Sequence, residues 1–194
     1  RGQIEILKLD AQWHEKPLPG AWFEVKNAKT GELFRMVTGS DGKAVSGELP
    51  AAYLGDDGRA VPYEYQVREI QAPEGFCLDH RVWKFWFNND HTPVAVQKIK
   101  AENEETRLWF SKSSFHTDHF VKGARLSIYN AKAENGKMQP WGEPLETWIS
   151  GPEPHLVSGK LSGGRTYFLV EEEAPEGYSA ADPVMFTVSA DGRS

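Results

Sequence analysis

The sequence predicts an all-β protein made of two tandem β-sandwiches. Its 194 residues include eighteen Gly and twelve Pro, and 12% are aromatic. The apolar residues alternate in short segments and show no long 3.6-residue period, which is typical of strands separated by turns. One strand-and-turn motif also occurs twice. Since each half of the chain is long enough for one modest core, we predict a first domain over residues 1–103 and a second over residues 104–194.

The repeated motif combines a strand that carries an inward-facing carboxylate with a turn. Its first copy, YEYQVREIQAPEGF, covers residues 63–76, and its second copy, YFLVEEEAPEGY, covers residues 167–178. In each copy a glutamate, Glu69 or Glu171, has the same strand parity as the apolar residues before it. A buried carboxylate without a partner costs several kcal/mol and tends to remain protonated. The Ala-Pro-Glu-Gly sequence that follows then ends the strand in a turn.

The first domain is predicted from runs of alternating or aromatic residues that are bounded by turn residues. In chain order these runs cover residues 4–10, 20–25, 33–38, 45–49, 63–71, 82–87 and 94–103. A longer loop is expected over residues 11–19, and turns are expected at residues 28–31, 39–42 and 88–91.

The second domain repeats this order. Residues 108–112, 122–128, 157–161 and 167–178 match residues 4–8, 19–25, 45–49 and 65–76. Residues 186–194 correspond only to the penultimate strand of the first domain and the turn after it. We therefore expect the second domain, as given by this sequence, to lack its final strand.

Three polar residues of the first domain lie on otherwise apolar strand faces. Lys8 has the parity of Ile4 and Ile6, although the opposite face of that strand is also apolar, so both orientations of the lysine remain open. Glu69 lies in the central strand. Asn103 ends the last strand on the same face as its apolar residues. If the three strands adjoin, these side chains meet in the core.

If the side chains of Lys8, Glu69 and Asn103 come together in the core, we expect a covalent reaction between them. Burial lowers the pKa of a lysine and raises the pKa of a glutamic acid, which favours a neutral amine beside a neutral acid. The acid can donate a hydrogen bond to the Asn103 carboxamide oxygen while the Lys8 amine attacks, and can then pass its proton to the departing ammonia. The product is a Lys–Asn isopeptide bond that forms once. The alternative is an ordinary buried ion pair, or a lysine that reaches the sheet edge. By the repeat, Lys112 and Glu171 form the equivalent pair.

These features resemble the Cna protein B-type (CnaB, prealbumin-like) domains. The resemblance lies in the strand lysine, the Gly-Ala segment after it, the Glu-x-x-Ala-Pro-x-Gly-aromatic motif and the terminal asparagine, and it covers nearly all of both halves. It implies Ig-like or prealbumin-like sandwiches with an internal isopeptide cross-link. Lys8 and Lys112 match the isopeptide lysine, Glu69 and Glu171 match the catalytic glutamate, and Asn103 alone matches the asparagine.

The resemblance also implies a place and a role. CnaB domains form stalks of pilins and adhesins, so we expect an extracellular, cell wall-anchored structural protein of a Gram-positive bacterium. Its expected partners are neighbouring domains of the same surface protein or pilus subunits. The sequence shows no Leu-Pro-x-Thr-Gly sorting signal and no Tyr-Pro-Lys-Asn pilin motif. A unit of a larger adhesin or minor pilin is therefore expected.

Other function classes have little support in the sequence. A net charge of −6 gives no basic surface for nucleic acid, and no apolar run is long enough to span a membrane. The single cysteine, Cys77, allows no internal disulfide. No phosphate loop, Ser–His–Asp arrangement or metal set is present, so no cofactor, metal or turnover enzyme is expected. The segment His116-Thr117-Asp118-His119 is interpreted as solvated loop residues.

The seven tryptophans suggest an alternative function, a carbohydrate-binding β-sandwich. Trp13, Trp141 and Trp148 lie near predicted loops, where exposed rings would stack on sugars. Trp83 and Trp86 have opposite parity, so only one of them can face outward from their strand. An exposed, coplanar pair of tryptophans would support sugar binding, whereas burial of most of the tryptophans would favour a structural stalk.

Overall fold

The computed structural model describes residues 1–87, 94–114 and 117–191, and the turn expected at 88–91 lies outside these ranges. The chain forms two compact units. The first unit comprises Arg1–Pro73 and Leu78–Glu104, and the second comprises Glu74–Cys77 and Glu105–Ser194. None of the described residues is helical, so the all-β prediction is confirmed. The described part of the chain accordingly offers no apolar helix of membrane-spanning length.

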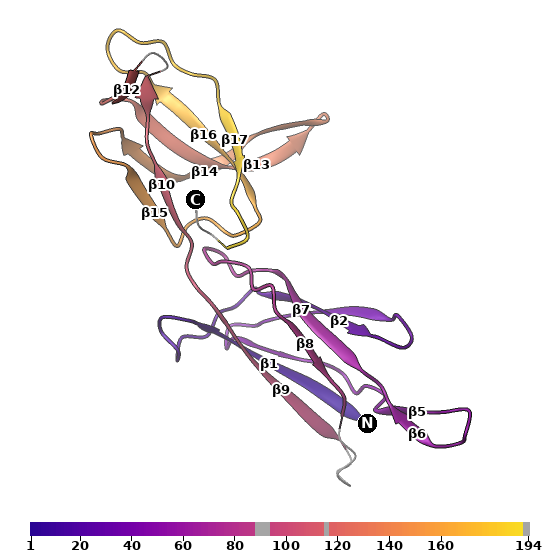
Figure 1. Ribbon diagram of the computed structural model, residues 1–194. Helices are drawn as coiled ribbons and strands as arrows, with labels where there is room; N and C mark the ends of the chain where they lie inside the picture. The colour runs from indigo at the N-terminus through magenta and orange to yellow at the C-terminus, as the bar shows by residue number, and fades with distance from the viewer. Residues whose placement is uncertain (88–93, 115–116, 192–194) are drawn as a thin grey trace. The chain divides into compact units, whose positions relative to one another are not determined.

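The described residues of the first unit form three sheets (Figure 1). A three-stranded sheet has the order β4-β1-β9, a four-stranded sheet has the order β3-β2-β7-β8, and β5 and β6 form a separate hairpin. The strands are β1 (Gly2–Asp10), β2 (Trp22–Asn27), β3 (Leu33–Val37), β4 (Lys43–Val45), β5 (Ala52–Leu54), β6 (Ala60–Pro62), β7 (Tyr65–Gln71), β8 (Val82–Phe85) and β9 (Ala95–Asn103). Most of these strands were predicted from the sequence, whereas the β5–β6 hairpin was not.

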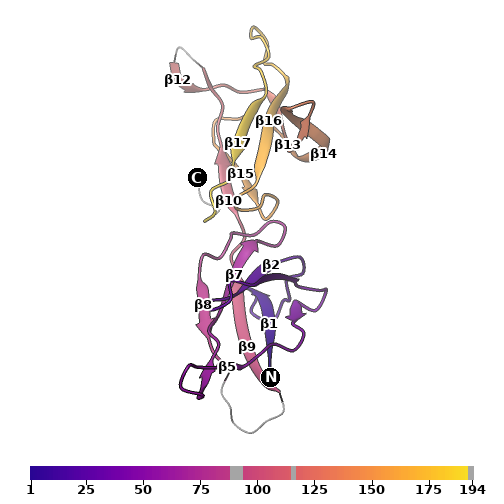
Figure 2. The same cartoon turned by 90° about the vertical axis from the view of Figure 1, so that its right-hand side faces the viewer.

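The first and last strands of this unit run side by side and parallel. All nine residues of β1 pair with β9, from Gly2 opposite Ala95 to Asp10 opposite Asn103. In both views the two strands lie next to each other along their whole length (Figures 1 and 2). The chain therefore enters the unit at one end of this strand pair and leaves it at the other.

The core of the first unit lies between its two larger sheets, as in a β-sandwich. Alternating residues of β1 and β9 on one side, and of β2 and β7 on the other, are buried because side chains of a strand point to opposite faces in turn. The fully enclosed apolar side chains of these four strands are Ile4, Ile6, Phe23, Val25, Val67 and Ala101. Lys8 lies on the same face as Ile4 and Ile6, which decides between the two orientations left open by the sequence.

The second unit repeats this plan with fewer strands among its described residues. Its four-stranded sheet has the order β14-β13-β16-β17, and β10 pairs only with β15 among the described residues. Figure 2 shows β13, β16 and β17 together. The strands are β10 (Arg107–Phe110), β11 (Ser113–Ser114), β12 (Thr117–Phe120), β13 (Arg125–Glu134), β14 (Lys137–Ile149), β15 (His155–Ser158), β16 (Thr166–Glu173) and β17 (Val184–Thr187).

By sequence order, β10 and β15 correspond to β1 and β4. No described strand takes the place that β9 has beside β1, which leaves the second edge of β10 open within the described residues. The core of this unit includes Leu108, Ile128, Val157 and Tyr167. The long β13–β14 hairpin was not predicted from the sequence.

A short segment of the Ala-Pro-Glu-Gly-Phe motif is part of the second unit. The Gly75 N–H donates to Ser162 Oγ at 3.0 Å, and the Gly75 carbonyl accepts from the Thr106 N–H at 3.0 Å. Gly75 has a φ of +84°, and a Cβ at this position would lie 2.2 Å from the Gly159 carbonyl oxygen. Glycine is therefore required here by both backbone conformation and space.

Candidate functional site

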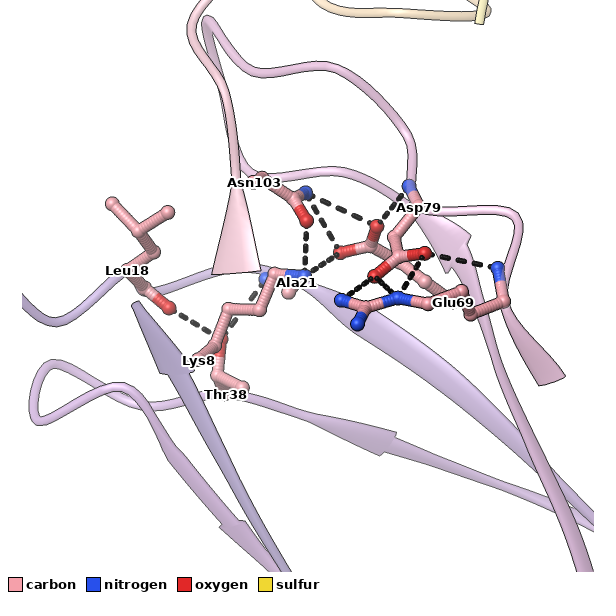
Figure 3. A network of polar contacts seen from close by, with 8 residues as sticks. Lys8, Leu18, Ala21, Thr38, Glu69, Asp79 and Asn103 are labelled. Carbon is pink, nitrogen blue, oxygen red and sulfur yellow. Dashed lines mark hydrogen bonds and ion pairs between the residues drawn. The ribbon is translucent and has the colours of Figure 1, made fainter. Parts of the chain in front are cut away.

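Three strands of the first unit bring together the polar side chains that the sequence singled out. Lys8 comes from β1, Glu69 from β7 and Asn103 from the end of β9. Figure 3 shows the three side chains pointing toward one another between the two sheets. Both facing sheets thus contribute to one polar cluster in an otherwise apolar core.

The contacts in this cluster are close and mutual. Lys8 Nζ lies 3.1 Å from Glu69 Oε1 and donates a hydrogen bond to Asn103 Oδ1. Asn103 Nδ2 donates to Oε1 and Oε2 of Glu69, each at 3.1 Å. The glutamate therefore faces the amide nitrogen of Asn103, whereas its hydrogen bond was predicted to be with the amide oxygen. Here the lysine contacts that oxygen.

The cluster is closed to solvent, and burial shifts its protonation. The side chains of Lys8 and Glu69 are 0% exposed. Burial lowers the pKa of Lys8, and the charge of Glu69 only partly opposes this shift. Burial likewise raises the pKa of Glu69 against the opposing effect of Lys8. Both shifts favour a neutral amine beside a neutral carboxylic acid.

Two backbone features orient Glu69. The Asp79 N–H donates to Glu69 Oε2 at 2.7 Å. The pairing of β2 with β7 also shifts beside the glutamate, because Trp22 is opposite Gln71 while Phe23 is opposite Glu69. Such a bulge bends a strand and redirects the side chains next to it.

The second unit has a reduced version of this site. Lys112 Nζ lies 3.1 Å from Glu171 Oε1, and the Ala181 N–H donates to Glu171 Oε2 at 2.7 Å. The lysine side chain is 21% exposed, whereas that of the glutamate is 3% exposed. A register shift between Arg125 and Leu126 lies beside Glu171, as in the first unit. Among the residues whose side chains are described, no asparagine or aspartate is hydrogen-bonded or ion-paired to Lys112.

Several neighbours of the site were not predicted from the sequence. Lys8 Nζ lies 5.5 Å from the centre of the Phe23 ring, which covers it on the β2 side. The Asp79 contact uses a backbone N–H, so no residue type indicates it. Its one signal in the sequence is the repeated spacing, since Asp79 and Ala181 each follow their glutamate by ten residues.

The tryptophans give no clear sugar-binding platform. Exposed tryptophans are Trp13, Trp22, Trp86, Trp109 and Trp141, and Trp148 is buried. The expected exposure of Trp148 is therefore wrong, because this residue packs inward from β14. Most tryptophans are exposed, contrary to what a stalk was expected to show. However, no ring contact within the described ranges joins two tryptophans.

No described group of three or more His, Cys, Asp or Glu side chains is arranged to hold a metal ion. Of the segment His116-Thr117-Asp118-His119, the first residue lies outside the described ranges. Cys77, which is half-buried, lies outside the strands.

Comparison with known proteins identifies a family. The family of SpaA prealbumin-like fold domains matches the chain twice, over residues 2–102 and 106–194. This match confirms the resemblance to prealbumin-like CnaB domains in two tandem copies. No curated protein matches the sequence.

Several solved structures are similar to the chain over 97% of its length. The Bacillus anthracis TIE protein is 24% identical with a TM-score of 0.43, and the chain spans 31% of it. A streptococcal ancillary pilin is 20% identical with a TM-score of 0.46, and 58% of it is covered. The shaft pilin SpaA from Lactobacillus rhamnosus GG is 16% identical with a TM-score of 0.45, and 94% of it is covered.

Proposed function

Because the chain belongs to the family of SpaA prealbumin-like fold domains, we propose that it is a structural module of a pilus or adhesin on the surface of a Gram-positive bacterium. In this proposal the first unit is stabilised by an isopeptide bond between Lys8 and Asn103. Its partners are neighbouring domains of the same surface protein or pilus subunits. Pilins among the similar solved structures agree with this role.

The observation that carries the proposal is the closed Lys8–Glu69–Asn103 cluster. The amine lies against the carboxamide, and the glutamate lies 3.1 Å from both the attacking and the leaving nitrogen. A neutral Lys8 amine attacks Cγ of Asn103. Glu69 donates its proton to Nδ2, takes one proton from Nζ and ends neutral. One C–N bond forms, one breaks, and ammonia leaves.

The position of this bond suits a load-bearing element. Lys8 and Asn103 lie on the parallel first and last strands of the first unit, 95 residues apart in the chain. Tension that enters near β1 would pass through the bond into β9 and leave the intervening chain unloaded. The reaction occurs once per molecule, so the protein is not a turnover enzyme.

The second unit carries Lys112 and Glu171 as the equivalent lysine and glutamate. By the internal repeat, a strand beside the open edge of β10 would supply the missing acyl group. The described residues contain no such strand, so only one cross-link is proposed for residues 1–194.

Intact mass of the purified chain tests the proposal. The wild-type mass should be lower than the sequence mass by one ammonia, and Lys8→Ala or Glu69→Ala should restore the full mass. Glu171→Ala is the matched control and should keep the wild-type loss. A wild-type chain of full sequence mass would exclude the bond. Peptide mapping should assign the loss to a fragment that joins Lys8 to Asn103.

A carbohydrate-binding function is the second candidate, favoured only by the exposed tryptophans. Trp86 lies at a hollow of about 850 Å³ that Arg1, Pro50 and Pro62 also line. A glycan-array screen of wild type against Trp86→Ala tests it.

A further inference from the structure

An ion pair lies beside Glu69 that the proposed chemistry does not use. Asp79 and Arg81 follow the turn after β7, and Arg81 Nη2 lies 2.6 Å from Asp79 Oδ2. Arg81 Nε also donates to both carboxylate oxygens, at 3.0 and 2.9 Å, and the Arg81 N–H donates to Oδ1 at 2.9 Å. The Asp79 side chain is 9% exposed and that of Arg81 is 61% exposed, and several charge-assisted hydrogen bonds join the two residues.

The segment is also held from the side of the core. The Arg81 guanidinium lies 5.2 Å from the centre of the Trp83 ring, and this ring lies 6.3 Å from that of Phe23. Phe23 in turn covers Lys8 Nζ. Packed groups therefore connect the ion pair with the reacting amine, while the Asp79 N–H connects it with the carboxyl group.

Glu69 and Asp79 line a common surface hollow of about 340 Å³, together with Leu78 and His80. Residues Leu78, Asp79 and His80 of this segment therefore border solvent beside Glu69. Movement of the segment would break the hydrogen bond between the Asp79 N–H and Glu69 Oε2.

Comparison with the second unit shows which of these features both units share and which belong to the first unit. There the Ala181 N–H makes the same 2.7 Å bond to Glu171 Oε2, so the backbone contact belongs to the fold. Ala181 and Pro183 take the positions of Asp79 and Arg81, and their side chains cannot form an ion pair. The first unit, which has the complete lysine, glutamate and asparagine cluster, therefore also has an ion pair in the segment that orients its glutamate. The second unit has no ion pair at these two positions.

We propose that Asp79 and Arg81 are positioning residues for the cross-linking reaction, an inference that rests on the proposed function. Their ion pair holds the Asp79 N–H on Glu69 Oε2. Asn103 Nδ2 donates to both carboxyl oxygens at 3.1 Å, but Oε2 alone accepts the shorter 2.7 Å bond from the Asp79 N–H. This additional bond favours Oε2 as the carbonyl oxygen of the neutral acid and so places the acid proton on Oε1. Oε1 is the atom that lies 3.1 Å from Lys8 Nζ and from Asn103 Nδ2. The pair thus directs the proton to the two nitrogens that exchange it.

Pulse-labelled cell-free synthesis of the full chain measures this effect. Samples are quenched in acidic denaturant at intervals, and ammonia loss is followed by mass. Parallel samples are challenged with protease, so the rate is expressed per folded molecule. Arg81→Gln and Asp79→Asn should each slow cross-linking at least about tenfold, since positioned general acid–base transfer contributes roughly 10²–10⁴-fold. Arg81→Lys keeps the charge without the forked contact and should react at an intermediate rate.

The chain offers a matched control in the β5–β6 turn. Asp57 and Arg59 have the same spacing, and the Arg59 N–H donates to Asp57 Oδ1 at 3.0 Å. Arg59→Gln should react at the wild-type rate. In an unreactive Asn103→Ala background, Arg81→Gln should also speed hydrogen exchange of the Asp79 amide, which reports its bond to Glu69.

The outcomes separate the two proposals. If wild type loses ammonia and both ion-pair variants react at its rate per folded molecule, the positioning role is wrong and the proposed function stands. If the variants only lower the protease-resistant fraction, the pair is structural and the inference is again overturned. If wild type loses no ammonia, both proposals fail.

Discussion

The two units place a lysine and a glutamate in equivalent strands but enclose them differently. Lys8 is 0% exposed and contacts Asn103 on β9, whereas Lys112 is 21% exposed and its edge strand β10 has no second neighbour among the described residues. The Lys–Glu distance is 3.1 Å in both units. The pair alone therefore does not distinguish the units. The final strand does, because it supplies both the carboxamide and the wall that excludes water.

The shared features show what the fold provides by itself. Each glutamate accepts a backbone N–H bond from the residue ten positions later, and each lies beside a register shift in its sheet. The fold therefore orients the glutamate carboxyl group in both units. The lysine side chain is fully enclosed in the first unit but not in the second.

Mechanical unfolding should show the largest difference between the units. Pulling the wild-type chain from its ends should extend the second unit fully but leave the chain between Lys8 and Asn103, which are 95 positions apart, folded or looped out of the load path. In Glu69→Gln, which should not form the bond, this part of the chain should add roughly 300 Å to the total extension, at about 3.3–3.6 Å per residue. Single-molecule force spectroscopy measures this directly.

Glu171→Gln is the control for the pulling experiment and should leave the total extension of the wild type unchanged. A wild-type first unit that extends fully would contradict the proposed force path.

Loss of the cross-link should also lower the equilibrium free energy of unfolding by several kcal/mol. A cross-link that closes a loop of this length is expected to add about 4–5 kcal/mol, by analogy with a disulfide. Glu69→Gln should lower the unfolding free energy of the first unit by about this amount. Glu171→Gln should cost the second unit less than the roughly 3–5 kcal/mol of a broken, fully buried pair, because Lys112 reaches solvent. Urea unfolding followed by residue-resolved hydrogen exchange reports the two units separately.

Equal losses in the two units would contradict this assignment. They would indicate that both glutamates serve only in ion pairs.

Strand periodicity explains why much of the site could be predicted. A side-chain period of two places Lys8, Glu69 and Asn103 among buried residues once their strands are recognised. Periodicity does not specify which strands adjoin. The parallel pairing of β1 with β9 depends on contacts between distant segments, and it alone brings Asn103 to Lys8. The chemical roles of the three residues stay predictions.

Other parts of the structure could not be predicted, because the corresponding sequence patterns are weak or favour a different structure. β14 contains Pro140, Gly142 and Pro144, which favour loops in isolation, yet it pairs along the long hairpin with β13. Trp148 lies in this strand, so its burial followed from an element that the sequence did not reveal. The orientation of Glu69 by Asp79 depends on a backbone N–H, which every non-proline residue carries.

The pH dependence of the unfolding free energy should show whether the Lys8 amine is free, with a smaller effect than in the two predictions above. In Asn103→Ala the amine and the acid both remain. The raised pKa of Glu69 contributes stability that is complete below the pKa of glutamate in the unfolded chain and is lost as pH rises through the folded value. The lowered pKa of Lys8 contributes stability that is complete above the unfolded lysine pKa and is lost as pH falls through the folded value.

The variant should therefore be least stable between these two folded-state pKa values and should regain stability toward alkaline pH. The gain is about 1.4 kcal/mol for each unit by which the lysine pKa is lowered. Wild type, whose Lys8 would be an amide, should lack this alkaline gain, and Lys8→Met should lack it as well. Urea unfolding across the pH range tests the difference, and an alkaline gain in wild type would indicate a free Lys8 amine.

The smallest expected difference concerns the cross-strand ion pairs on the outer sheet faces. Glu24 and Arg68 join β2 to β7 at 2.6 Å, and Arg125 and Glu173 join the equivalent strands β13 and β16 at 2.8 Å. Glu24 is 15% exposed whereas Glu173 is 67% exposed, so water screens the second pair more strongly. Double-mutant cycles to alanine should give coupling energies within about 0.2–1 kcal/mol, with the Glu24–Arg68 value the larger. Added salt should reduce both values. A larger coupling for Arg125–Glu173 would show that solvent exposure does not rank these two pairs.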